Sequence, residues 1–225
     1  ISGFIDINGN AVLQPKYTSL RYFHDGLSCA KLEGNEKYGY IDRKFNIVID
    51  TKFIEASDFS EGLARVKYNQ GDKYLFIDKT GKQVIESTFF QANDFSEGLA
   101  SVQADSQTGW GCIDKQGNYV IQPKYAYIGN FSEGLVAFDA MEDNGIKYGF
   151  MGTDGNIVID PIYDNVTSFH EELAAVEVTI DEKNDGIDVK HKWGYIDKNG
   201  NLKIKAQYDE ALEFTNGVAI VRIGS

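Results

Sequence analysis

The sequence has few of the residues that build disulfide frameworks or metal sites. Its 225 residues include two cysteines and three histidines. Cys29 and Cys112 occur in unlike sequence contexts, so they form no recurring disulfide or metal framework, and we expect both to pack in a core. His24, His170 and His191 are not spaced as metal ligands. We therefore predict that the chain has no metal site and no cofactor.

Long apolar stretches are also absent. No run approaches the roughly 18 apolar residues that a membrane-spanning helix needs, so membrane insertion is not expected. Residues 1–10 lack the basic and apolar regions of a secretory signal, but a chain that does not begin with methionine would look the same after signal removal. The sequence therefore leaves localisation open between the cytoplasm and export.

Basic residues are too few to balance the acidic ones. The chain has 22 Lys and Arg against 34 Asp and Glu, which gives a formal net charge of −12 and a pI near 4.7. A nucleic-acid backbone would be repelled by most of this surface, whereas cations or a basic protein surface would be attracted. We therefore expect no nucleic-acid partner.

Glycine and aromatic residues are abundant, and they recur with a period. There are 23 Gly, 14 Phe and 13 Tyr but only 3 Pro, a mixture that favours short strands and tight turns. A motif of an aromatic residue, Gly, a second aromatic residue, Ile and Asp recurs with some substitutions. Its copies start at the anchor residues Ser2 (which replaces the first aromatic residue), Tyr38, Tyr74, Trp110, Tyr148 and Trp193. These six anchors are 36, 36, 36, 38 and 45 residues apart. Such a period indicates a repeat architecture.

A second motif, Phe-Ser-Glu-Gly-Leu, follows each anchor at a fixed distance. Its phenylalanine lies 21 residues after the anchor in all six copies, as at Phe59, Phe95 and Phe131. All length variation falls between this motif, which we name the corner, and the next anchor. The chain is therefore predicted to be a single repeat domain over residues 1–225, with repeats at 2–37, 38–73, 74–109, 110–147, 148–192 and 193–225.

Each repeat is predicted to contain three or four antiparallel strands. An anchor strand such as 193–197 is followed by a turn at 198–201 and a second strand, because Gly200 supplies the positive φ that a tight hairpin needs. A short irregular or fourth strand leads to the corner, after which Leu-Ala-x-Val starts the last strand. Pro15, Pro123 and Pro161 share one repeat position at the end of a strand ladder.

Side-chain alternation suggests how the sheets pack. One face of the anchor strand carries rings and the other carries glycine, as in Tyr38 to Ile41, and these faces would be complementary if one copy stacked on the next. We predict an all-β propeller-like toroid, closed by pairing of residues 218–223 with residues 1–6. The alternative is an open β superhelix or solenoid. It is favoured by the short repeat, since most anchors here are 36 residues apart whereas common propeller blades use about 40 to 50 residues.

The residues Trp193-Gly194-Tyr195-Ile196-Asp197, the following Asn199-Gly200, Ile121-x-Pro123-x-Tyr125 and the corner motif resemble the bacterial WG-repeat (KWG) family. The resemblance covers essentially the whole chain. The departures are that only Trp110 and Trp193 keep the tryptophan, Leu75 replaces the glycine, Gly152 replaces the aspartate and Ala206 replaces the proline. The resemblance implies a β-repeat module of bacterial proteins and transfers no catalytic residue.

Prominent polar residues recur with the repeat, which argues against a catalytic centre. The corner residues Glu61, Glu97 and Glu133 with Ser60, Ser96 and Ser132 are predicted to hydrogen-bond backbone N–H groups. The Asp-x-Asn-Gly-Asn segments at 6–10 and 197–201 are predicted to be hairpin turns because they lack the ligands of a calcium loop. Phosphate loops, Cys-x-x-Cys motifs and nucleophile elbows are also missing. We predict a non-enzymatic module for protein or glycan binding; the alternatives are a β-propeller hydrolase or lyase with a central site, and an architectural spacer.

Two insertions distinguish successive repeats. Residues 139–147 and 177–192 occupy the same repeat position and are predicted to form neighbouring loops on one edge. Their acidic residues would attract a basic partner, unless they serve only as solvated loops. The candidate binding residues are Asp139, Glu142, Asp143, Asp181, Glu182, Asp185 and Asp188.

Overall fold

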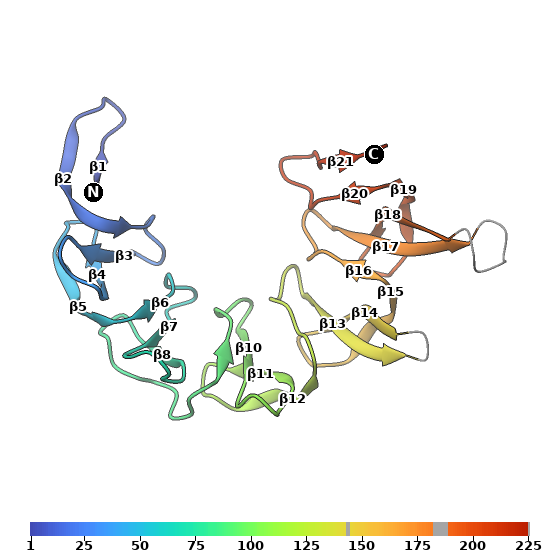
Figure 1. Ribbon diagram of the computed structural model, residues 1–225, viewed down its shortest axis with the longest axis horizontal. Coiled ribbons are helices and arrows are strands. Elements are labelled where there is room, and N and C mark those ends of the chain that lie inside the picture. The colour runs from blue at the N-terminus through green and yellow to red at the C-terminus, as the bar shows by residue number, and fades with distance from the viewer. Residues whose placement is uncertain (143–144, 182–188, 225) are drawn as a thin grey trace. The chain divides into compact units, whose positions relative to one another are not determined.

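The computed structural model describes residues 1–142, 145–181 and 189–224, and this part of the chain is built from β-strands without a helix. It forms two compact units, Ile1–Thr108 with Ile113–Asn118, and Gly109–Cys112 with Tyr119–Ser225. The strands of the first unit are β1 (Ser2–Ile5), β2 (Ala11–Leu20), β3 (Leu27–Leu32), β4 (Tyr38–Asp42), β5 (Ile47–Phe53), β6 (Glu55–Ala56), β7 (Ala64–Lys67), β8 (Leu75–Ile77), β9 (Gln91–Ala92) and β10 (Leu99–Gln103) (Figure 1).

The boundary between the units runs through β11 (Trp110–Asp114). The remaining strands, all in the second unit, are β12 (Tyr119–Tyr125), β13 (Leu135–Glu142), β14 (Gly145–Gly152), β15 (Ile157–Tyr163), β16 (Asn165–Val166), β17 (Leu173–Asp181), β18 (Val189–Asp197), β19 (Leu202–Tyr208), β20 (Glu210–Ala211) and β21 (Val221–Arg222). The prediction of an all-β fold is confirmed.

Each interior sheet combines strands of two successive repeats. The last strand of one repeat pairs antiparallel with the anchor strand of the next, as β7 does with β8 and β17 with β18. The anchor strand then pairs with the second strand of its own repeat, as in β4–β5 and β18–β19. The short fourth strands β6 and β16 flank β7 and β17. Strands β1 and β2 pair with each other, as do β20 and β21, and closure of 218–223 onto 1–6 stays a prediction.

The anchor-strand glycine has a different role from the one predicted. A Cβ atom at Gly149 would lie 2.5 Å from the carbonyl oxygen of Ile159 and 2.8 Å from the nitrogen of Pro161. The register shifts at this point, since Tyr148 faces Tyr163 and Phe150 faces Ile159, so the second strand bulges toward the glycine. The glycine therefore admits the backbone of its own hairpin and is not a surface for stacking repeats. The same close approach occurs at Gly3, Gly39, Gly111 and Gly194.

The third repeat shows what happens when this glycine is absent. Leu75 takes its place and is buried in β8. The following segment makes only isolated bridges to the anchor strand, Tyr74 to Phe89 and Ile77 to Gln83, in place of a regular second strand. Where a leucine replaces the glycine, the anchor strand and the segment that follows it therefore do not form the closely paired hairpin of the other repeats.

Contacts between neighbouring repeats use the turn glycine instead. Gly81, with φ +83°, would place a Cβ atom 3.0 Å from a methyl group of Ile49 in the preceding repeat. Gly155 has the same relation to Ile121, with a distance of 3.1 Å. Glycine thus serves twice at these turns, by adopting positive φ and by leaving room for the neighbouring isoleucine. The same contact joins Gly117 to Ile85 and Gly200 to Ile159.

The aromatic residues form the core of each repeat. The corner phenylalanine packs edge-on against the second ring of the anchor strand, as Phe169 does against Phe150 with centroids 4.8 Å apart. Both rings are fully buried. Equivalent pairs are Tyr40–Phe59, Phe76–Phe95 and Tyr195–Phe214, and Phe4–Phe23 is stacked. These pairs hold each repeat together, and the pairs in which both rings are buried offer no open platform for a ligand.

Both cysteines are buried, as expected. Burial raises the pKa of the Cys29 thiol to about 12. This side chain is therefore a protonated packing residue near neutral pH.

Candidate functional site

The recurring corner residues join one repeat to the next. Ser60 and Leu63 exchange two backbone hydrogen bonds around Glu61 and Gly62, whose φ values are 52° and 88°, so the corner is a two-residue hairpin turn of type I′. The corner carboxylate then accepts a hydrogen bond from the corner backbone of the following repeat. The observed bonds are Asp25 from Gly62 N (2.6 Å), Glu61 from Gly98 N (3.0 Å), Glu133 from Glu171 N (2.7 Å) and Glu172 N (2.9 Å), and Glu171 from Gly217 N (2.8 Å).

The corner serine also reaches the next repeat. Ser60 donates to the carbonyl oxygen of Phe95, and Ser132 donates to that of Phe169, both at 2.6 Å. The predicted bonding of the acidic side chains to backbone N–H groups is thus correct, whereas the serines bond carbonyl oxygens. Neither side chain is available as a nucleophile or a general acid.

Electrostatics supports the same role for the corner acids. Burial by itself would raise the pKa of Glu61, but hydrogen bonds from Lys115 and from the amide of Gly98 hold it below its usual value. Lys115 lies 3.0 Å from the Glu61 carboxylate. In the second unit Lys198 contacts Glu133 in the same way, at 3.1 Å.

The aspartates that end the anchor strands hold the hairpin turns. Asp42 Oδ1 accepts hydrogen bonds from the backbone N–H groups of Lys44 and Asn46, and Oδ2 accepts one from the Asn46 side chain. The hydrogen bonds from the Asn46 side chain and backbone lower the pKa of Asp42. Asp154 performs this function where Gly152 replaces the usual aspartate. These segments are hairpin turns, as predicted, and the described residues contain no group of three or more His, Cys, Asp or Glu placed to hold a metal ion.

The two insertions extend hairpins instead of forming loops. Strands β13 and β14 pair as far as Glu142 and Gly145, and β17 and β18 pair as far as Asp181 and Val189. Because each insertion continues an antiparallel ladder that already exists, the added residues lengthen both strands. The expectation of loops is wrong for this described part of the insertions.

The seven predicted binding residues differ in their positions. Asp139 is 6% exposed, and its Oδ1 accepts a hydrogen bond from the backbone of Tyr127 at 2.8 Å, so it fixes an adjacent segment. Glu142 is exposed at the end of β13, and Asp181 ends β17. The remaining residues, Asp143, Glu182, Asp185 and Asp188, lie outside the described part of the chain.

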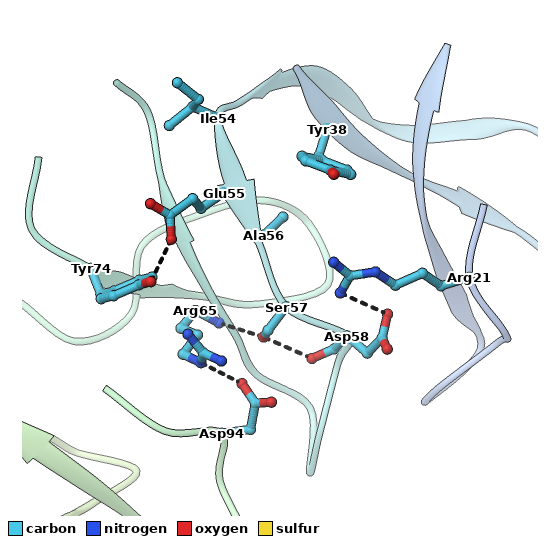
Figure 2. Close-up of a pocket in the computed structure, with 10 residues that line it drawn as sticks. All are labelled: Arg21, Tyr38, Ile54, Glu55, Ala56, Ser57, Asp58, Arg65, Tyr74 and Asp94. Atoms are coloured by element: carbon cyan, nitrogen blue, oxygen red, sulfur yellow. Dashed lines mark hydrogen bonds and ion pairs between the residues drawn. The ribbon is translucent and has the colours of Figure 1, made fainter. Parts of the chain in front are cut away.

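A pocket in the first unit collects several charged residues, among them two arginines that do not recur with the repeat (Figure 2). Its volume is about 440 Å³. Arg21 follows β2, Arg65 lies on β7, and Asp58 and Asp94 each precede a corner phenylalanine. The other lining residues are Tyr38, Ile54, Glu55, Ala56, Ser57 and Tyr74.

Each arginine of this pocket has one acidic partner and one tyrosine ring. Arg65 Nε donates to Asp94 Oδ1 at 2.9 Å, and its guanidinium carbon lies 5.2 Å from the centre of the Tyr74 ring. Arg21 Nη1 lies 3.7 Å from Asp58 Oδ1, and its guanidinium carbon lies 5.8 Å from the Tyr38 ring. The first pair is a charge-assisted hydrogen bond, whereas the second is an ion pair without a hydrogen bond.

The left side of the pocket in Figure 2 carries a carboxylate bonded to a phenol. Tyr74 Oη donates to Glu55 Oε2 at 2.5 Å. This bond, from the side chain of Tyr74, lowers the pKa of Glu55. Burial, followed by the same bond, raises the pKa of Tyr74, so near neutral pH Glu55 is ionised and Tyr74 is protonated.

Sequence reasoning missed this pocket because its two arginines occupy different repeat positions. Arg65 lies two residues after the corner leucine, where the other repeats have Cys29, Ser101, Ala137, Ala175 and Ile220. Arg21 lies two residues before the corner phenylalanine, a position that is otherwise uncharged. The sequence signal that could have indicated the pocket is the presence of a charged residue at each of these two positions, where the other repeats have uncharged residues.

Comparison with known proteins agrees with the repeat architecture. The family model described as "WG containing repeat" matches six times, at residues 3–35, 38–74, 76–106, 110–139, 148–179 and 193–225. The chain belongs to the WG-repeat family. This confirms the resemblance drawn from the sequence. No curated protein sequence matches the chain significantly.

Solved structures show a similar fold at low sequence identity. Two structures of Kluyveromyces lactis Hsv2 are 13% and 14% identical, each with a TM-score of 0.51 over 84% of this chain. The WG-repeat chain covers 63% and 64% of those two chains. Virginiamycin B lyase from Staphylococcus aureus is 13% identical over 88% of this chain and 85% of the other, with a TM-score of 0.42. The Hsv2 structures support a propeller-like β fold and indicate nothing about a ligand.

In the residues that the structure describes, no helix has the length and apolar character needed to cross a bilayer.

Proposed function

We propose that this WG-repeat chain is a non-catalytic binding module and that the pocket of the first unit is its ligand site. One observation carries the proposal. The recurring corner acids and strand-end aspartates are already used to hold turns and join repeats, whereas Arg21 and Arg65, which have no charged counterpart in the other repeats, gather with Asp58 and Asp94 around one pocket. Residues that the scaffold does not require, brought together in a hollow, are candidates for recognition.

The chemistry of the pocket supports binding over catalysis. Its only hydroxyl on an aliphatic side chain, that of Ser57, donates to the carbonyl oxygen of Asp58 and accepts from the Arg65 backbone N–H. Ser57 is therefore not placed to act as a nucleophile. Arginine remains protonated and cannot exchange a proton near neutral pH. These properties count against the alternative of a propeller hydrolase or lyase, and an architectural spacer would have no need of the pocket.

The candidate partners are a protein or a glycan. The net charge of −12 disfavours nucleic acid, and the exposed Glu142 on the β13–β14 hairpin suits a basic protein surface. The acidic edge predicted from the insertions therefore remains a second candidate surface for a basic partner.

The test is a binding screen with pocket variants. The whole chain would be applied to immobilised glycans and to basic peptides, beside Arg21→Gln, Arg65→Gln and the control Arg222→Gln, whose exposed side chain pairs with Glu210 and does not line the pocket. We expect binding that both pocket variants lose and the control keeps. A substrate turned over by the isolated chain, with turnover abolished by one polar substitution, would contradict the proposal.

A further inference from the structure

The pocket places a partly exposed guanidinium beside a buried acceptor that has no hydrogen-bond partner among the described residues. Asp58 Oδ1 is buried and has no hydrogen-bond partner among the described residues. The nearest guanidinium nitrogen, Arg21 Nη1, is 3.7 Å away, which is too long for a hydrogen bond. The Arg21 guanidinium itself makes no hydrogen bond within the described chain. A buried acceptor left in this way costs free energy until a partner reaches it.

Few chemical groups satisfy both side chains at once. A carboxylate or phosphate would accept from Arg21 but would be repelled by Asp58. An ammonium or guanidinium group would donate to Asp58 but would be repelled by Arg21. A hydroxyl group donates one hydrogen bond and accepts others, so a single hydroxyl can bridge the two side chains without net charge.

The opposite wall offers the same mixture of donors and acceptors. Asp94 accepts a hydrogen bond from Arg65 Nε, which leaves the two terminal nitrogens of that guanidinium as donors. Glu55 is exposed and supplies carboxylate oxygens near Tyr74. Two arginines and three carboxylates line the pocket, and Lys67 lies 3.4 Å from Glu55, so the positive and negative charges balance. The volume of about 440 Å³ falls within the usual range for small-ligand sites, about 300–1,000 Å³.

The backbone around the pocket is held in place before any ligand arrives. Tyr40 Oη, from the buried core, donates to the carbonyl oxygen of Ser57 at 2.6 Å. The Arg21 backbone donates to Cys29 O and accepts from the Ser28 hydroxyl. Both walls are thus fixed by the sheet, which reduces the entropy lost on binding.

We infer that the pocket binds a neutral carbohydrate, with one sugar hydroxyl bridging Arg21 and Asp58 and another reaching Arg65 or Glu55. The inference rests on the proposed binding function. A sugar ring carries neighbouring hydroxyls that each donate and accept, and this matches alternating guanidinium and carboxylate groups. An uncharged ligand is also not repelled by a protein of net charge −12.

The test compares three ligand classes by calorimetric titration of the whole chain. The probes are neutral hexose disaccharides, uronate-containing disaccharides and a lysine-rich peptide. The variants are Asp58→Asn, Arg21→Gln and Arg21→Lys, with Arg222→Gln as the matched control. Circular dichroism and the urea midpoint of each variant establish that it is folded.

We expect neutral disaccharides to bind, with an affinity loss of about tenfold or more in Asp58→Asn and Arg21→Gln and none in Arg222→Gln. Arg21→Lys should retain part of the affinity, because the ammonium group still donates to a hydroxyl. Binding only of uronates, only of the peptide, or of neutral sugars with unchanged affinity in both pocket variants would overturn the sugar inference and leave the module proposal standing. If the chain binds none of the probes and nothing in the wider screen, both proposals fail.

Discussion

The close approach at the anchor glycine predicts a large effect of one methyl group. In Gly149→Ala, the new Cβ atom would lie 2.5 Å from Ile159 O, 2.8 Å from Pro161 N and 2.9 Å from Asp160 C. All three are backbone atoms of β15, so no side chain can rotate away to relieve the contact. The hairpin formed by β14 and β15 must open or shift.

The expected destabilisation follows from two opposing contributions. Forcing an extra methyl group into a packed site costs about 1–3 kcal/mol, and an immovable backbone neighbour places this substitution at the upper end. Replacing glycine by alanine also stabilises by about 0.4–1 kcal/mol, because the unfolded chain loses conformational freedom. We therefore expect a net loss of about 2 kcal/mol, which lowers the urea midpoint by about 1 M for an m-value near 2 kcal/mol/M.

Urea unfolding followed by tryptophan fluorescence provides the assay. Trp110 and Trp193 both belong to the second unit, so their emission reports the unit that contains Gly149. The control is Gly217→Ala, where φ is +78° but no atom lies within 4 Å, so the alanine meets backbone strain without a steric clash. We expect a loss of about 1 kcal/mol for the control. A Gly149→Ala midpoint equal to or above that of Gly217→Ala would refute the assignment of this glycine to close strand approach.

Two further predictions concern the contacts between repeats and closure of the chain. Glu61→Gln should destabilise the first unit by about 1 kcal/mol, a value reduced by partial exposure, because a neutral amide accepts more weakly from the Gly98 N–H. The pKa of Glu61 is lowered in the folded state, so the ionised side chain stabilises the fold above the usual glutamate pKa, and this stabilisation is lost as pH falls through the folded-state pKa. Equal acid sensitivity of wild type and Glu61→Gln, followed by circular dichroism, would contradict this. For closure, the interior register pairs Glu177 with Trp193, so the equivalent pair would be Arg222 and Ser2. A closed ring predicts that Ser2→Cys with Arg222→Cys forms an intramolecular disulfide at low protein concentration, whereas only concentration-dependent dimers on non-reducing gels would favour the open superhelix.

The fold was predictable because the information for it is repeated. A fixed distance of 21 residues between anchor and corner phenylalanine leaves little freedom in strand order, and the hairpin glycines mark the turns. The role of the anchor glycine was not predictable, because it depends on a register shift between Tyr148 and Phe150. Alternation along a single strand gives its two faces but does not show that the partner strand bulges.

The binding residues were harder to predict for a different reason. In the sequence, Asp139 is one of several acidic residues in an insertion. In the structure it lies within the paired part of β13, and its side chain is buried and bonded to the Tyr127 backbone. Arg21 and Arg65 are 44 positions apart and occupy different places in the repeat. Only the packing of successive sheets brings them to one pocket, so no local pattern could group them.

The division between repeated and unrepeated residues suggests where function can vary within such a scaffold. Corner acids, strand-end aspartates and turn glycines bond to backbone or fill space between repeats, so changing them weakens the protein wherever they occur. The position two residues after the corner leucine has no such fixed partner, since it holds Cys29, Arg65, Ser101, Ala137, Ala175 or Ile220 in the six repeats. A charged residue at this position costs desolvation, which for Arg65 is offset by its hydrogen bond to Asp94 and its contact with the Tyr74 ring. Arg65 at this position lines the hollow while its Nε bonds Asp94, so under the proposed function this is where the scaffold acquires a binding group.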